Sequence, residues 1–194
     1  MTITLQSLFS LARFTVQNPR EGARMVMQAD VPVAGRWIAL ALMAILSAVL
    51  AHLSIGMMPA EIRGEMGNAI ASPFRTAVLQ GGLMLLAAHA IVWIGRWRGG
   101  IGTFDDVLIL MVWLQFILLI LQVVQIVVQL LLPPLAQVVG FASIAIFLWL
   151  ISNFVAEVHK FKSVPMTFLG VILAMFAMGF VMALVLMFFM GPVV

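Results

Sequence analysis

Residues 107–131 form a stretch of about 25 residues without a formal charge, and this stretch most constrains what the chain can fold into. At about 1.5 Å per residue, a helix of this length crosses the roughly 30 Å hydrocarbon layer of a bilayer. Two aspartates precede the stretch, and Pro133 and Pro134 follow it. The stretch is therefore predicted to be a transmembrane helix.

The composition extends this prediction to the whole chain. Of its 194 residues, 64% are hydrophobic and 9% are charged, whereas soluble domains have about 25% charged residues. The chain has no cysteine, which excludes disulfides, thiolate metal sites and cysteine nucleophiles. The net charge of +3 is divided among apolar segments and forms no continuous basic face, so we do not expect nucleic acid as a partner.

The fold class expected from this pattern is all-α: an integral membrane bundle of five transmembrane helices with an N-terminal interfacial amphipathic helix. Uncharged apolar runs long enough to cross the bilayer define the five spans. The predicted spans are residues 34–53, 76–95, 107–131, 138–155 and 166–190. Residues 33–194 are thus predicted to form the transmembrane domain.

Residues 1–32 are predicted to form cytoplasmic or interfacial helices. Residues 1–17 have helical spacing, which gives an amphipathic helix suited to the membrane surface. Its apolar face consists of Leu5, Leu8, Phe9, Ala12 and Val16. A second, short helix is expected to run to about Asp30, because Asn18 and Glu21 have the spacing of a capping box.

The basic residues lie mostly near alternate ends of the spans. Eight of the ten Lys and Arg residues lie in the N-terminal segment and in the second and fourth connections, whereas Arg63 and Arg75 lie in the other connections. The positive-inside rule places the N terminus in the cytoplasm and the C terminus, after five spans, in the periplasm. The Arg-rich, Ala-rich and Gly-rich composition favours a bacterial source, so the predicted location is the bacterial inner membrane.

This count gathers most ionisable groups on the cytoplasmic face. Such a face is either a docking surface for a protein or for lipid headgroups, or a topology signal combined with helix capping. The residues are Arg20, Glu21, Arg24, Arg96, Arg98, Asp105, Asp106, Glu157, His159, Lys160 and Lys162.

Neither a metal nor a cofactor is predicted at this face. Glu157 and His159 are two residues apart, so on a helix they point about 200° apart and do not share a ligand position. Gly99, Gly100 and Gly102 lack the spacing of a phosphate-binding loop, and the following aspartates would repel phosphate. These glycines therefore predict a tight turn.

The predicted spans also contain polar residues that are candidates for a functional role: His89, Gln115, Gln122, Gln125, Gln129 and Asn153. The four glutamines fall within an arc of roughly 80° on one helix, and this side should face protein or water. The stripe either joins helices by hydrogen bonds or lines a hydrated path for a small solute. His89 and Gln115 have similar predicted depths, which suggests a hydrogen bond between their helices.

Three short motifs resemble the bacterial branch of the Yip domain family: NPREG at residues 18–22, GGIGTF at residues 99–104 and FVAEVHKF at residues 154–161. The resemblance covers about residues 8–190. It implies five-span membrane proteins, which in eukaryotes belong to the early secretory pathway, bind prenylated Rab GTPases and influence vesicle budding.

The function favoured by the sequence is that of a non-enzymatic membrane scaffold or adaptor whose cytoplasmic face engages proteins or lipids. One alternative is a small-solute transporter or channel lined by the glutamine stripe and His89. A second alternative is a lipid-handling protein. Small-residue faces on the first and fifth spans also make a homo-oligomer a candidate assembly.

Overall fold

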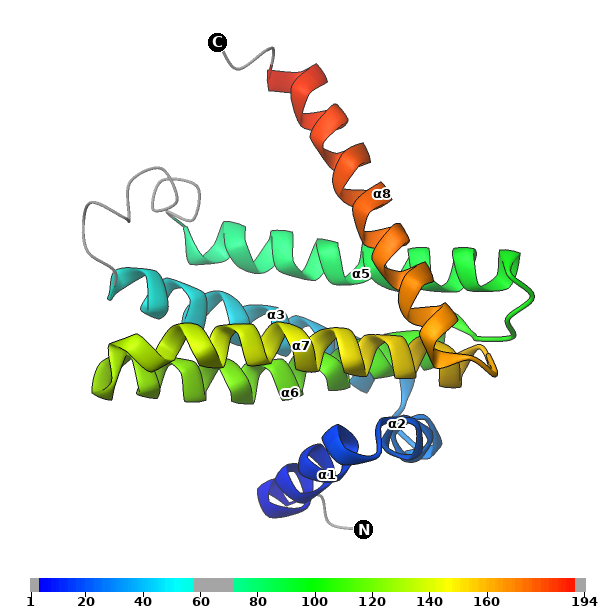
Figure 1. The fold of residues 1–194 in the computed structure, drawn as a ribbon, viewed down its shortest axis with the longest axis horizontal. Coiled ribbons are helices and arrows are strands. Elements are labelled where there is room, and N and C mark those ends of the chain that lie inside the picture. Colours follow the sequence, from blue (N-terminus) through cyan, green and yellow to red (C-terminus); the bar gives the residue numbers. More distant parts are fainter. Residues whose placement is uncertain (1–3, 58–71, 191–194) are drawn as a thin grey trace.

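The computed structural model describes residues 4–57 and 72–190, and these residues form seven α-helices (Figure 1). Five of the helices are long and apolar enough to span a membrane, which confirms the predicted fold class. The helices are α1 (Leu5–Gln17), α2 (Pro19–Gln28), α3 (Val33–Gly56), α5 (Pro73–Trp97), α6 (Phe104–Leu131), α7 (Pro133–Val158) and α8 (Val164–Met190). The first connection, which contains Arg63, lies largely outside the described residues.

The helix boundaries follow from local backbone chemistry. Pro73 and Pro133 each stand at the first position of their helix, where the missing N–H costs nothing. Thr103 caps α6 by accepting a hydrogen bond from the backbone N–H of Asp106. Only Leu132 separates α6 from α7. The helices extend beyond the predicted spans by up to five residues because these end signals lie outside the apolar core.

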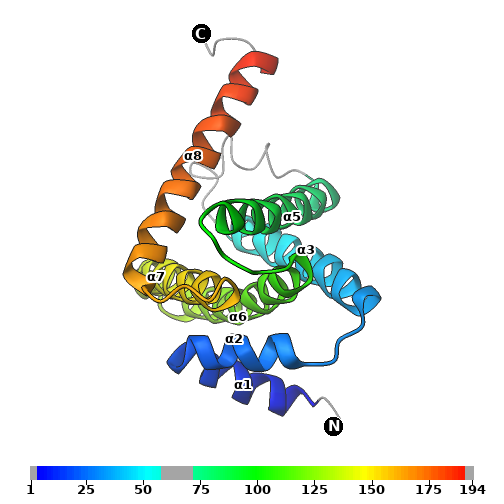
Figure 2. The ribbon, with the colours of Figure 1, turned by 90° about the vertical axis from the view of Figure 1, so that its right-hand side faces the viewer.

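Helix α6 is the centre of the bundle. It packs against α3, α5 and α7, and the four helices lie side by side in two views (Figures 1 and 2). Leu108, Leu114 and Ile117 of α6 are almost completely buried between these neighbours. The uncharged stretch from which the prediction started is thus the main source of the core.

Helix α8 packs against α7 near the turn that joins them and then leans away from the other helices (Figure 2). Large apolar side chains on α8, including Leu173, Phe176 and Phe180, are well exposed. Exposed apolar side chains on a spanning helix suit contact with lipid tails.

Helices α1 and α2 pack against α6 and α7, below the bundle in Figure 2. The Nε1 of Trp113 donates a hydrogen bond to Oγ1 of Thr15 at 3.2 Å, and Thr15 is fully buried. The Nε1 of Trp149 donates to the carbonyl of Val16 at 3.3 Å. The predicted apolar face of α1 is therefore divided, because Ala12 is buried against the bundle whereas Leu5 and Phe9 remain exposed.

The predicted capping box between Asn18 and Glu21 is wrong. The Asn18 side chain makes no capping hydrogen bond, and its backbone has φ −130° and ψ 69°, outside the extended region typical of a capping residue. Asn18 also ends α1, since its N–H donates to the carbonyl of Phe14 at 2.8 Å. Asn18 therefore has the backbone conformation that the kink between α1 and α2 requires. Helix α2 ends at Gln28, slightly before the expected end near Asp30.

Candidate functional site

The carboxylate of Glu157, one residue before the end of α7, is surrounded by three cations. The Nε of Arg20 lies 3.0 Å from Oε2, the Nε of Arg24 lies 2.9 Å from Oε1, and the Nζ of Lys160 lies 2.6 Å from Oε1. The Glu157 side chain is 1% exposed, so these contacts replace the water that it loses. We call these four residues the ionic clamp.

The ionic clamp fixes α2 against the end of α7. Arg20 and Arg24 are four residues apart on α2, so their side chains project from the same face. The Nη2 of Arg20 also donates to the carbonyl of Phe161 at 3.1 Å. Ala23, between the two arginines, is fully buried, which allows a close approach of α2. The Glu157 carboxylate raises the pKa of Arg24 through its hydrogen bond and its charge.

Lys160 has a left-handed backbone conformation, with φ 59°. It follows the end of α7. There the backbone N–H of Phe161 donates to the carbonyl of Ala156 at 2.8 Å, and the backbone N–H of Lys160 donates to the carbonyl of Glu157 at 3.2 Å. This pattern is a Schellman motif, whose left-handed position is usually glycine. The side chain costs about 1 kcal/mol there relative to glycine. From this position its ammonium group reaches Glu157.

Helix α5 ends with the same motif, but with glycine at the left-handed position. Gly99 has φ 83°, and the N–H of Gly100 donates to the carbonyl of Gly95 at 2.8 Å. The two motifs have the same backbone hydrogen bonds and differ in the side chain at the left-handed residue. The glycines predicted the turn at Gly99, whereas nothing in the sequence predicted the matching turn at Lys160, because lysine is not typical of this conformation.

His159 is 2% exposed, and backbone atoms hold both of its ring nitrogens. The N–H of Gly102 donates to Nδ1 at 3.2 Å, so Nδ1 carries no proton. The Nε2 therefore carries the proton and donates to the carbonyl of Ile91 at 3.1 Å. Burial lowers the pKa of His159, the hydrogen bond to Ile91 opposes this shift, and the nearby Arg96 charge lowers the pKa further. The ring is a neutral connector between α7, α5 and the turn at residues 98–103.

Three glycines make room for this ring. A Cβ atom at Gly95, Gly100 or Gly102 would overlap the imidazole of His159. The glycine-rich turn is thus a histidine cradle, a role that sequence reasoning missed. The sequence contains glycines on both sides of the end of α5 and one histidine after α7. Nothing in the sequence showed that these two segments are in contact.

The remaining ionisable candidates lie at the same end of the bundle. The Nε of Arg96 donates to the carbonyl of Gly102 at 3.1 Å, and the Oγ1 of Thr103 donates to Oδ2 of Asp106 at 2.6 Å. The carbonyl of Asp105 accepts from Nη1 of Arg36 at 2.8 Å. Glu21, Arg98 and Lys162 are exposed. We call this end, with Arg20, Arg24, Arg96, Arg98, Lys160 and Lys162, the basic end.

Comparison with known families supplies the identification. The profile of the Yip1 domain matches residues 14–187, from within α1 to within α8. The chain belongs to the Yip1 domain family. Comparisons with curated proteins and with solved structures give no significant match. The three motifs on which the resemblance rested contribute Arg20, Gly102, Glu157 and His159, so in this Yip1 domain they meet in the ionic clamp and the histidine cradle.

Inside the Yip1 domain, the predicted hydrogen bond between His89 and Gln115 is wrong. The Nε2 of Gln115 donates to Oγ of Ser47 on α3 at 2.7 Å. The Nδ1 of His89 instead contacts the carbonyl of Leu85 at 2.8 Å, and its ring lies 4.5 Å from that of Phe104. Equal depth was the basis of the prediction, but depth does not specify the direction in which a side chain leaves its helix.

The glutamine stripe of the Yip1 domain contacts more than one helix. Gln115, Gln122, Gln125 and Gln129 are all partly buried. Whereas Gln115 reaches α3, the amide of Gln125 lies against Gly140 of α7. Asn153 is 3% exposed and its Nδ2 donates to the carbonyl of Trp149 at 2.8 Å.

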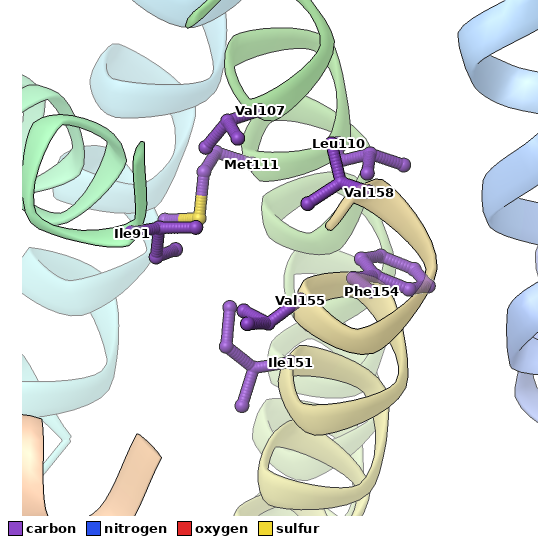
Figure 3. Close-up of a pocket in the computed structure, with 8 residues that line it drawn as sticks. All are labelled: Ile91, Val107, Leu110, Met111, Ile151, Phe154, Val155 and Val158. Atoms are coloured by element: carbon purple, nitrogen blue, oxygen red, sulfur yellow. The ribbon is translucent and has the colours of Figure 1, made fainter. Parts of the chain in front are cut away.

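A small pocket lies between α5, α6 and α7 near the basic end (Figure 3). Its volume is about 10 Å³, which is about the space that a single water molecule needs. All of its lining side chains are apolar: Ile91, Val107, Leu110, Met111, Ile151, Phe154, Val155 and Val158. This pocket therefore suits neither a polar solute nor an acyl chain.

Proposed function

We propose that this Yip1 domain protein is a non-enzymatic membrane scaffold or adaptor, with the basic end in the cytoplasm of a bacterial cell. Eight of the ten Lys and Arg residues belong to the N-terminal segment and to the second and fourth connections, and this asymmetry supports the orientation. The C terminus would then be periplasmic. The basic end would engage proteins and lipids at the inner surface of the plasma membrane.

The ionic clamp is the observation that carries this proposal. It joins α2 to the turn between α7 and α8, so an ion-pair network around one buried carboxylate fixes the position of the basic end. Around the single Glu157 carboxylate, the side chains of Arg20, Arg24 and Lys160 are 35%, 53% and 52% exposed. A rigid, positively charged surface is suited to recognising acidic partners.

Transport has less support. Gln115 and Gln125, two of the residues proposed to line a path, contact neighbouring helices. The pocket near the basic end is apolar and has room for about one water molecule.

Orientation can be tested directly because the chain has no native cysteine. S72C places a thiol at the start of α5, and K162C places one in the turn before α8. A membrane-impermeant maleimide applied to intact spheroplasts should label S72C and leave K162C unlabelled until the membrane is opened. The reverse pattern would show that the basic end is outside.

The adaptor role can be tested by cross-linking in cells followed by purification in mild detergent. Arg98 and Lys162 are exposed and lie outside the ionic clamp, so R98E with K162E should reduce cross-linked partners while the fold remains intact. R13E is the matched control, because Arg13 is an exposed residue of α1 away from the basic end. Recovery of the same partners from wild type and the double variant would contradict the proposal.

A further inference from the structure

The ionic clamp contains more positive charge than Glu157 neutralises. Three cations contact one carboxylate, and the nearby exposed residues Glu21 and Lys162 cancel each other. The clamp and its surroundings therefore have a net charge of about +2. An excess of this size attracts an anion of matching geometry.

The arginines also retain hydrogen-bond donors. Within the described residues, Arg24 donates through Nε, and Arg20 donates through Nε and Nη2. A guanidinium group has five N–H donors in a planar fork, which matches carboxylate and phosphate oxygens. Because Glu157 binds both arginines at Nε, it orients the forks and leaves N–H groups at their outer ends for a second anion.

Lys160 provides an independent indication. Glycine is favoured at a left-handed residue, and Gly99 occupies the equivalent position at the end of α5. Lys160 has the same conformation despite its side chain, which is 52% exposed. Backbone strain at a non-glycine residue is commonly retained where its side chain has a function. Neutralising Glu157 does not account for Lys160, since two arginines already contact that carboxylate.

The position of the clamp identifies the anion. Lys160 lies in the short turn between α7 and α8, two helices that are long and apolar enough to span the membrane. Such a turn lies at the depth of the lipid headgroups. Phosphate is the anionic group that is abundant at this depth, and clustered Lys and Arg residues beside a span recognise it.

We infer that Arg20, Arg24 and Lys160 bind the phosphate of an anionic lipid headgroup, with Glu157 orienting the two guanidinium groups. The inference rests on the proposed function only in placing the basic end at a membrane surface. The bound group is a phosphodiester with a net negative charge. A free phosphate ion has similar chemistry, so the test includes both sources.

The test is native mass spectrometry of the full chain, released from detergent after incubation with phosphatidylglycerol or with phosphatidylcholine of the same acyl chains. Wild type should retain more phosphatidylglycerol than phosphatidylcholine. R24Q and K160G should each lower this retention roughly fivefold, the effect of about 1 kcal/mol per basic residue near an anionic surface. K160G is the sharper variant because glycine suits the left-handed backbone, so the fold should be maintained.

R13Q is the matched control, since it removes an exposed arginine outside the clamp and should retain phosphatidylglycerol as wild type does. An equal loss in R13Q would overturn the site by showing that only total charge matters. Undiminished retention in K160G and R24Q would also overturn it. Displacement of the lipid by an equal concentration of inorganic phosphate would reject the lipid headgroup as the source.

These outcomes are separate from those of the adaptor test. Lipid retention depends on Arg24 and Lys160, whereas the cross-linking experiment depends on Arg98 and Lys162. If the lipid test fails while R98E with K162E loses its protein partners, only the lipid inference is wrong. If the lipid test succeeds while the protein partners are unchanged, only the adaptor proposal is wrong.

Discussion

Gly95 of α5 lies against the imidazole of His159 so closely that a Cβ at residue 95 would overlap Nε2. The contact joins the ends of α5 and α7, which are far apart in the sequence. The ring of His159 therefore reaches the carbonyl of Ile91 only because residue 95 has no side chain.

G95A should lower the free energy of unfolding in detergent by about 1–3 kcal/mol, because the added methyl group must displace a buried ring. G82A is the matched control in the same helix, since a Cβ at Gly82 would meet no atom within 4 Å. There the substitution should stabilise by about 0.5–1 kcal/mol through helix propensity. Thermal unfolding of the two purified variants measures both effects, and equal melting temperatures would argue against the cradle.

Stability should depend on pH through His159. Its pKa in the folded protein is lowered by burial, whereas the unfolded chain titrates near the ordinary value of about 6.5. The unfolded state therefore binds the proton more readily, and the stabilisation is complete above about pH 6.5 and is lost as the pH falls toward the folded pKa. H159N keeps a polar side chain without a titrating ring and should flatten the curve of melting temperature between pH 8 and pH 5. A curve with the same slope in H159N would assign the dependence to other groups.

The pair of Arg24 and Glu157 should show coupling in a double-mutant cycle. Arg24 is half exposed, so solvent screens its pair with Glu157, and the coupling between R24Q and E157Q should be weak but measurable. E157Q alone affects all three pairs and should cost about 1–3 kcal/mol. Chemical unfolding of the four proteins gives the cycle, and additive effects would show that the pair of Arg24 and Glu157 does not stabilise the fold.

T15V tests the attachment of α1. Valine has nearly the shape of threonine but leaves the Nε1 of the buried Trp113 without its acceptor, which should cost about 1–2 kcal/mol. S10A removes an exposed hydroxyl from the same helix and should change stability by less than about 0.5 kcal/mol. Limited proteolysis within α1 measures its detachment, and equal cleavage of T15V and wild type would count against this contact.

The sequence predicted the spans well because the bilayer requires long apolar runs, and length and charge alone reveal them. Charge asymmetry likewise predicted which ionisable residues share an end of the bundle. It did not predict their pairing, since Glu157 could have met any cation on that face. The failure of the bond between His89 and Gln115 has the same origin, because sequence gives depth along a helix but not the rotation that selects Ser47 as the partner.

The single residue between α6 and α7 has a consequence for biogenesis. With Leu132 as the whole connection, α6 and α7 form a tight hairpin. We expect the two helices to insert into the bilayer as one unit, because a single connecting residue does not allow one helix to be placed far from the other. The aspartates at the start of α6 and Glu157 near the end of α7 would then lie at the same membrane surface.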